Sequence, residues 1–210
     1  EFWTSSNMDQ RMAILDQLES DYYGPGLLSL AETILSPGQV SEANLRLRAV
    51  DLLTGNTSPD ILPILAKVLN GPDEDIHVDA IRAASQVKDP ALVEFLDEAT
   101  HSENPELRLT GLHVIDGLSG DLRSTALTRA LESAHEDVAL TAVSLIEVEA
   151  SESTVHLLFD ALEASNQSVQ EEARLSLDYI FGRSFSSGDE ARTWWASHQS
   201  EFGPELVRKD

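Results

Sequence analysis

The sequence contains no cysteine, only three lysines, and no long run of apolar residues. The missing cysteines exclude disulfide bonds, thiol catalysis and thiolate metal sites, but they suit an exported protein as well as a cytosolic one. No apolar run approaches the roughly 18–20 residues that span a bilayer, so we expect a soluble segment without direct membrane insertion. Because the chain begins at Glu1 without a methionine, a periplasmic or exported protein whose signal or anchor precedes Glu1 is one expectation, and a cytosolic protein is the other.

Basic residues are scarce throughout the chain. The 14 Lys and Arg residues stand against 37 Asp and Glu, which gives a formal net charge of −23. Nucleic-acid binding needs Lys and Arg to neutralise phosphates, so this balance argues against a nucleic-acid partner and against anionic lipid surfaces. The field favours a basic protein or peptide, although solubility alone would also explain the charge.

Sequence signatures of catalysis are also missing. None of the six histidines pairs with another at helical metal-ligand spacing, and the chain has no glycine-rich phosphate loop or nucleophile elbow. The acidic stretch at 73–79 resembles a calcium loop only superficially, because it lacks the glycine and the closing glutamate of that motif. We therefore expect no enzyme, no catalytic residues, no metal and no cofactor.

What the sequence does contain is a 31-residue repeat. Three columns recur at this step, an apolar residue, a small one four positions later and an apolar one four positions after that. They are Leu45, Ile76, Leu107, Val138 and Val169; Ala49, Ala80, Gly111, Ala142 and Ala173; and Leu53, Ala84, Ile115, Ile146 and Leu177. The spacing i, i+4, i+8 marks one face of a helix, and the small central residue allows a neighbouring helix to approach closely.

A second helix precedes this one in each repeat. Leu65, Leu96, Leu127 and Leu158 recur at the same step, as do the candidate N-caps Ser58, Asp89, Gly120 and Ser151. Short polar turns join the two helices. Since neither helix can bury its apolar stripe alone, the units must stack. The sequence predicts an all-α fold, a right-handed α-solenoid of about five helix pairs in one domain over 1–210, with an N-terminal cap (1–26), repeats (27–182) and a C-terminal cap (183–210).

The repeat resembles bacterial HEAT repeats of the compact kind, including the PBS-lyase HEAT-like group. The stretches at 104–120 and 42–53 carry the resemblance, through Leu107, Arg108 and Gly111 in the first and Leu45, Arg46 and Ala49 in the second. The arginine of the family pattern is replaced elsewhere by His77, Ala139 and Gln170. The resemblance implies an armadillo-like superhelix that serves as a binding surface, and it implies little about activity.

Two adjacent tryptophans stand near the end of the chain, in the stretch 190–202. Ala191, Trp195, His198 and Phe202 fall on one face of a predicted helix over about 188–202. A helix that carries large aromatic residues suits a lid over the exposed end of the last repeat. The alternative is an aromatic shelf for a ligand.

One further column suggests where a partner could bind. Leu47, Val78, Leu109 and Leu140 stand two positions after the first apolar column, and charged or polar residues flank them. By helical-wheel angle these residues are expected near the concave face, either as core between repeats or as an apolar stripe in an acidic groove. The predicted partner-binding residues are Leu47, Val78, Leu109, Leu140, Arg48, Asp79, Arg82 and His113. We also expect ion pairs between repeats, Arg48 with Asp79 and Asp51 with Arg82.

These observations favour a monomeric, non-catalytic scaffold that binds a protein or peptide on its concave face, where a basic amphipathic helix or an extended peptide would suit the groove. An accessory to an enzyme, by analogy with the phycobilin lyases that share the repeat, is the alternative. A structural domain of a longer chain is the third.

Overall fold

The computed structural model describes residues 7–21, 25–36 and 38–209. In these residues the regular secondary structure is helical, and an isolated β-bridge joins Phe202 to Arg208. The all-α prediction is therefore confirmed. No helix in the described part is long and apolar enough to cross a membrane.

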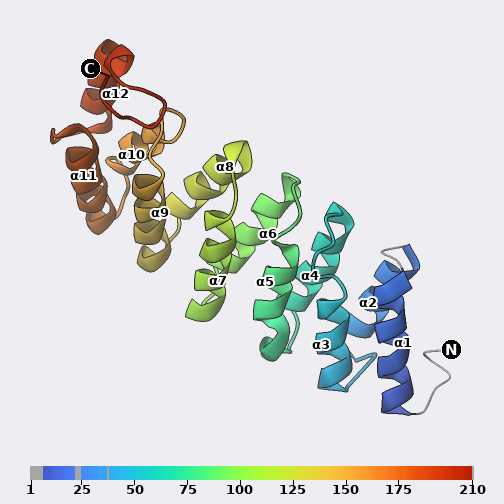
Figure 1. Cartoon of the computed structure of the whole chain (residues 1–210). Coiled ribbons are helices and arrows are strands. Elements are labelled where there is room, and N and C mark those ends of the chain that lie inside the picture. Colours follow the sequence, from blue (N-terminus) through green and yellow to red (C-terminus); the bar gives the residue numbers. More distant parts are fainter. Residues whose placement is uncertain (1–6, 22–24, 37, 210) are drawn as a thin grey trace. The chain divides into compact units, whose positions relative to one another are not determined.

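The helices alternate in pairs along the chain (Figure 1). The first helices of the pairs are α2 (Pro25–Leu35), α4 (Leu62–Leu69), α6 (Ala91–Thr100), α8 (Gly120–Leu131) and α10 (Val155–Ala161). The second helices are α3 (Ala43–Asp51), α5 (His77–Ala84), α7 (Pro105–Asp116), α9 (Glu136–Val148) and α11 (Gln167–Phe181). An additional helix stands at each end, α1 (Met8–Asp21) and α12 (Gly188–His198), and short 3₁₀ turns occur at Pro59–Ile61, Glu74–Ile76 and Gln199–Glu201. The five predicted helix pairs are thus present, as in an α-solenoid.

The three predicted columns of the second helices form the core. All of their members are buried, including Gly111, and so are Leu65, Leu96, Leu127 and Leu158 of the first helices. The small central residue brings neighbouring second helices together, as the packing of α3 on α5 and of α9 on α11 shows. The 31-residue period therefore reports burial between consecutive pairs.

The chain divides into two compact units. Unit 1 comprises residues 1–99 and 104–114, and unit 2 comprises residues 100–103 and 115–210. Each unit has its own stacked helices and its own buried columns. The single domain expected from the sequence stays a prediction.

The predicted N-caps are confirmed in part. The Ser58 hydroxyl accepts from the Asp60 backbone N–H at 3.3 Å, and the Asp89 carboxylate accepts from the Ala91 N–H at 2.9 Å. Gly120 is instead the first residue of α8, with Ser119 at the cap position. Ser151 begins a turn that precedes α10. At Gly120 the difference follows from a shorter link, because only residues 117–119 separate α7 from α8.

At the N-terminal end, α1 packs on α3 through the fully buried Leu15. The Arg48 guanidinium lies 2.9 Å from the Asp16 carboxylate, which ties the two helices together. Arg82 pairs with Asp79 on its own helix, at 3.4 Å. These contacts differ from the expected pairing between repeats, because α1 and the i, i+3 neighbour lie closer to the two arginines. Residues 1–6 and 22–24 of the predicted cap lie outside the described residues. Pro25 and Gly26, which the prediction assigned to the cap, instead begin α2.

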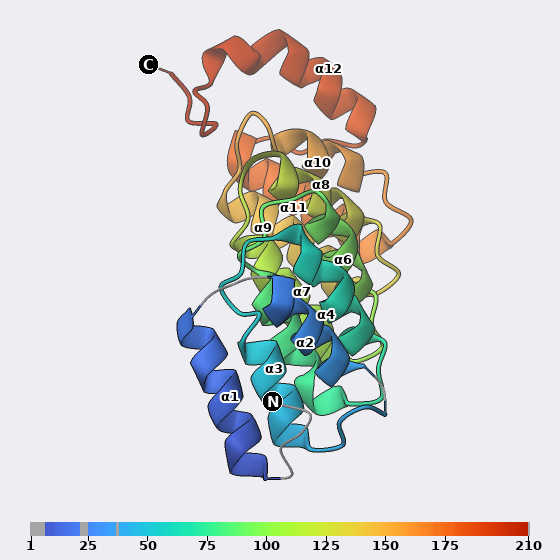
Figure 2. The ribbon, with the colours of Figure 1, turned by 90° about the vertical axis from the view of Figure 1, so that its right-hand side faces the viewer.

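At the C-terminal end, α12 lies across α10 (Figure 2). Trp195 and Ala191 are buried beneath it, as the lid interpretation predicts. A Cβ atom at Gly188 would overlap the Phe159 carbonyl oxygen, so only glycine permits this close approach. The Gly188 N–H also donates to the Glu163 carboxylate at 2.7 Å. The lid is therefore held by both apolar burial and hydrogen bonds.

Replacing Trp195 by alanine is expected to lower the free energy of unfolding by about 3–5 kcal/mol, because it removes a buried aromatic side chain and leaves a cavity. Urea denaturation followed by circular dichroism measures this change. The control is Thr193→Ala, at an exposed position of the same helix. An unchanged unfolding midpoint for Trp195→Ala would rule out the lid role.

The start of α12 should also make stability depend on pH. The Ser186 hydroxyl and N–H and the Arg183 guanidinium all donate to Glu190, and they lower its pKa from 4.5 to about 2. Because the pKa is lowered in the folded state, this contribution is present above pH 4.5 and is lost as the pH falls toward 2. We expect Glu190→Gln to melt below the wild type at pH 7, with a difference that narrows from pH 4.5 downward. A difference that stays constant between pH 7 and pH 3 would contradict this assignment.

Candidate binding surface

The solvent-facing side of the second helices carries a row of residues at i, i+4 and i+8, which we call the outer row. It comprises Leu47, Asp51 and Gly55; Val78, Arg82 and Gln86; Leu109, His113 and Gly117; Leu140, Ser144 and Val148; and Glu171, Leu175 and Tyr179. All are exposed except the half-buried Val78 and Leu140. The predicted residues therefore lie on this row, apart from Arg48 and Asp79, which flank it. The apolar column is not core between repeats.

In unit 1, the outer row places apolar side chains in solvent at two helices. Leu47 on α3 is 37% exposed and Leu109 on α7 is 56% exposed. His113 lies one turn after Leu109, and Arg82 holds its ion pair with Asp79 on α5. The row in this unit is thus mixed in charge, with isolated apolar positions.

In unit 2, the outer row is more apolar at its C-terminal end. Val148 on α9 and Tyr179 on α11 are 82% and 81% exposed, and Leu175, one turn before Tyr179, is 54% exposed. α9 packs directly on α11, and Val148 and Tyr179 hold equivalent positions of the two helices, 31 residues apart. We call the three exposed side chains the unit 2 patch. None of these three residues was among the predicted partner-binding residues, although continuing the apolar column by four and eight positions along each second helix would have found them.

Carboxylates surround the unit 2 patch. Glu147 accepts from the Ser176 hydroxyl, and Glu171 pairs with Arg174 on the same helix. The exposed Asp178 adjoins Tyr179. A partner that covers the patch must therefore bury apolar surface within a negative field, which favours a partner with both apolar and cationic side chains.

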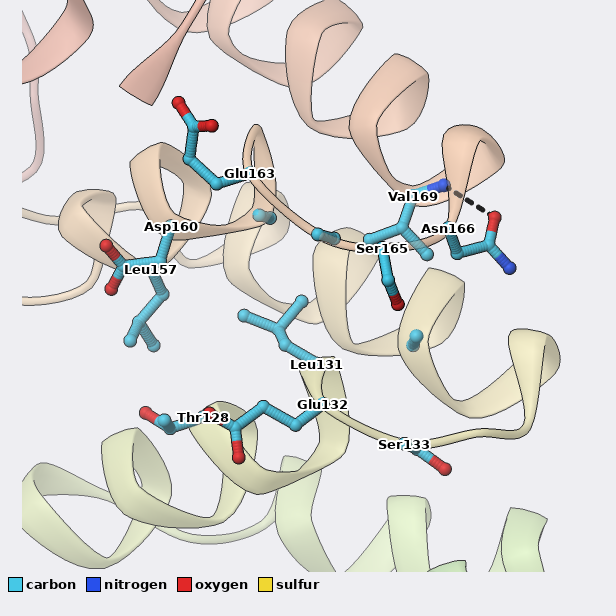
Figure 3. Close-up of a pocket in the computed structure, with 13 residues that line it drawn as sticks. Thr128, Leu131, Glu132, Ser133, Leu157, Asp160, Glu163, Ser165, Asn166 and Val169 are labelled. Atoms are coloured by element: carbon cyan, nitrogen blue, oxygen red, sulfur yellow. Dashed lines mark hydrogen bonds between the residues drawn. The ribbon is translucent and has the colours of Figure 1, made fainter. Parts of the chain in front are cut away.

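A separate pocket of about 410 Å³ opens in unit 2 where the pair α8/α9 meets the pair α10/α11. Leu131, Leu157 and Val169 supply apolar walls, and Glu132, Asp160 and Glu163 lie around them (Figure 3). The Asn166 carboxamide beside the pocket caps α11 by accepting from the Ser168 N–H at 2.8 Å. Sequence reasoning did not indicate this pocket.

The aromatic residues at the C-terminal end pack on one another. The ring centres of Phe181 lie 5.1 Å from Trp194 and 5.3 Å from Phe202. The His198 ring stacks on Trp194 at 4.6 Å and 14°, and the Arg183 guanidinium lies 5.8 Å from the same indole. These distances are those of direct ring contact. Phe181, Trp194, His198 and Phe202 also line a pocket of about 380 Å³, so the ligand-shelf interpretation stays an alternative beside the lid.

Possible metal and cofactor ligands are dispersed. Within residues 7–21, 25–36 and 38–209, no group of three or more His, Asp or Glu side chains is placed to hold a metal ion. The histidines instead make local contacts. His77 Nε2 lies 3.1 Å from the Gly71 carbonyl oxygen, and His198 Nδ1 lies 2.8 Å from the Trp194 carbonyl oxygen.

Residues 39–115 match the family model described as HEAT repeats. This segment of the chain consists of HEAT repeats. The same columns and helix pairs extend the HEAT architecture beyond the matched residues, through α11. A search of curated proteins found no match.

The HEAT arginine column has a structural role at the turn of each pair. Arg46 is buried and pairs with Asp73 in the next turn. His77 and Gln170, which replace the arginine, contact the carbonyl oxygens of Gly71 and Ala164, each six residues earlier. Arg46 thus joins two consecutive repeats, whereas His77 and Gln170 each bond the turn of their own helix pair. These two replacements preserve hydrogen bonding at a turn.

The outer row and the buried columns predict opposite effects for similar substitutions on α11. Leu175→Gln should change the free energy of unfolding by less than about 0.5 kcal/mol, because the side chain is exposed. Leu177→Gln, two residues later at a fully buried position, should cost about 3 kcal/mol or more because it places an amide in the core. Thermal and urea unfolding distinguish the two, and equal losses would show that the outer row also supports the fold.

Proposed function

We propose that the protein is a non-catalytic scaffold that binds a basic protein segment, with the unit 2 patch as its main anchor. HEAT repeats commonly act as protein-interaction scaffolds, and no single residue set in the described part suggests catalysis. The observation that carries the proposal is the exposure of Val148, Leu175 and Tyr179 on two packed helices.

Two physical features favour such a partner. A patch of large apolar side chains on the rigid face of α9 and α11 can be covered without reorganising the repeats, so binding loses little conformational entropy. The surrounding acids and the net charge of −23 attract a cationic segment and repel polyanions. A basic amphipathic helix meets both requirements, because its apolar stripe can cover the patch while Lys and Arg face the carboxylates.

A fluorescein-labelled helical peptide of leucine and lysine, with one apolar and one basic face, tests this proposal by fluorescence anisotropy. The double variant Leu175→Gln/Tyr179→Gln removes apolar area without changing the charge and should weaken binding at least about tenfold. Leu109→Gln tests the row in unit 1. Binding should also weaken as ionic strength rises.

The matched control is Val207→Gln, because Val207 is 67% exposed but lies outside the second helices. It should bind the peptide like the wild type. A peptide of the same apolar face with glutamate in place of lysine should not bind. Undiminished binding by the double variant would show that charge alone attracts the peptide, and the proposed anchor would be wrong.

A further inference from the structure

Two pockets occupy equivalent places in the repeat. The pocket in unit 1 has a volume of about 240 Å³, and its lining includes Val40, Arg46, Pro72, Asp73 and Ile76. The pocket in unit 2 has a volume of about 410 Å³, and its lining includes Ser133, Ala139, Ser165, Asn166 and Val169. Each of these five positions lies 93 residues, or three repeats, after its counterpart. Both pockets therefore lie where the turns of two consecutive helix pairs meet.

In unit 1 an arginine of the chain itself occupies this place. The Arg46 side chain is only 8% exposed, lies in the pocket lining and forms an ion pair with Asp73 of the next turn. The place between the two turns thus accommodates a guanidinium group and its aliphatic stem.

In unit 2 the equivalent position is Ala139, which ends at Cβ and is buried. No side chain from this column extends between the turns, and the pocket is larger than its counterpart by roughly the volume of several methylene groups. The larger volume is what the loss of an arginine side chain should leave.

The charges around the pocket change in the complementary direction. Glu132, Asp160 and Glu163 line the unit 2 pocket, whereas the positions 93 residues earlier hold Gln39, Lys67 and Asn70. The lining of the unit 2 pocket contains no Lys or Arg. Asp73 and Asp75 of the unit 1 lining correspond to Asn166 and Ser168, so two carboxylates in one place stand against three in the other, and Arg46 and Lys67 have no basic counterpart in unit 2.

The three carboxylates are not equally available. Asp160 pairs with Arg192 of α12, and Glu163 accepts from the Gly188 N–H. The Glu132 side chain has no hydrogen-bond or ion-pair partner within residues 7–21, 25–36 and 38–209. Glu132 also lies at the C-terminal end of α8, where the helix dipole adds negative potential.

We propose that the unit 2 pocket takes the side chain of an arginine supplied by the partner protein. Its aliphatic stem lies along Leu131 and Leu157, and its guanidinium group donates to Glu132. Arginine fits better than lysine because the equivalent place already holds a guanidinium, whose planar fork can donate to a carboxylate at two points. This proposal rests on the proposed function, since it adds a specific anchor for the same basic partner.

The test uses amide NMR of the full chain, titrated with acetyl-arginine amide as the probe. Saturable shifts are expected at the amides of Ser133, Ser165 and Asn166. Acetyl-citrulline amide has the same shape without the charge and should cause no saturable shifts. Equal responses to the citrulline probe, or to acetyl-lysine amide, would overturn the assignment of a guanidinium site.

Two variants report on the pocket itself. Glu132→Gln should weaken probe binding about tenfold, as for the loss of a charge-assisted hydrogen bond. Glu152→Gln removes the same charge from an exposed position outside the lining and should have no effect. Ala139→Arg returns a tethered arginine to the pocket and should abolish probe binding, with a melting temperature at or above that of the wild type. If Ala139→Arg does not fold, the comparison of Glu132→Gln with Glu152→Gln decides.

The arginine-probe experiment and the leucine–lysine peptide experiment can succeed or fail independently of each other. Loss of arginine-probe binding in Glu132→Gln, with binding retained in Leu175→Gln/Tyr179→Gln, supports the pocket independently of the patch. If the leucine–lysine peptide depends on the patch but no arginine probe binds, the scaffold proposal stands and the pocket proposal fails.

Discussion

Burial of a short apolar column between consecutive helix pairs is the interaction on which the rest of the structure depends. Helices as short as α4 and α10, with 8 and 7 residues, are marginal alone in water. Their stability must come from the stack, where Ala49, Ala80, Ala142 and Ala173 permit close approach of the second helices. Because one stripe of each second helix satisfies this requirement, the opposite stripe is free to vary. The outer row is that stripe, so a change there need not cost stability.

The turns within the helix pairs show the same division between positions that hold the fold and positions that can vary. The HEAT arginine column holds Arg46, His77 and Gln170, which differ in size and charge but all reach polar groups of a turn. Ala139 cannot do so, and the repeat tolerates it because the buried columns beside it remain intact. A position whose side chain bonds the turn in one repeat therefore has no such role in another. The two proposed contacts, an apolar patch and an arginine pocket, both lie in unit 2.

The helix pairs, the buried columns and the burial of Trp195 could be predicted from the sequence, because each follows from the regular spacing of apolar residues. It was less informative about ion pairs. Arg48 contacts Asp16, whose helix lies outside the repeat, so a column argument could not have found it. The exposure of Val148 and Tyr179 was missed because the apolar column was followed for too few turns. The unit 2 pocket could not be predicted, since it arises from a missing side chain whose place is known only once Arg46 is seen in three dimensions.

The central claim is that binding uses the outer row while the columns beneath it hold the fold. Amide NMR of the wild-type chain with the leucine–lysine peptide tests it most directly, because it maps the contact without any substitution. The account predicts that shifts concentrate on the C-terminal halves of α9 and α11, around Val148, Leu175 and Tyr179, while the first helices α8 and α10 change little outside their ends. Shifts spread evenly over the acidic surface, or centred on the first helices, would contradict it.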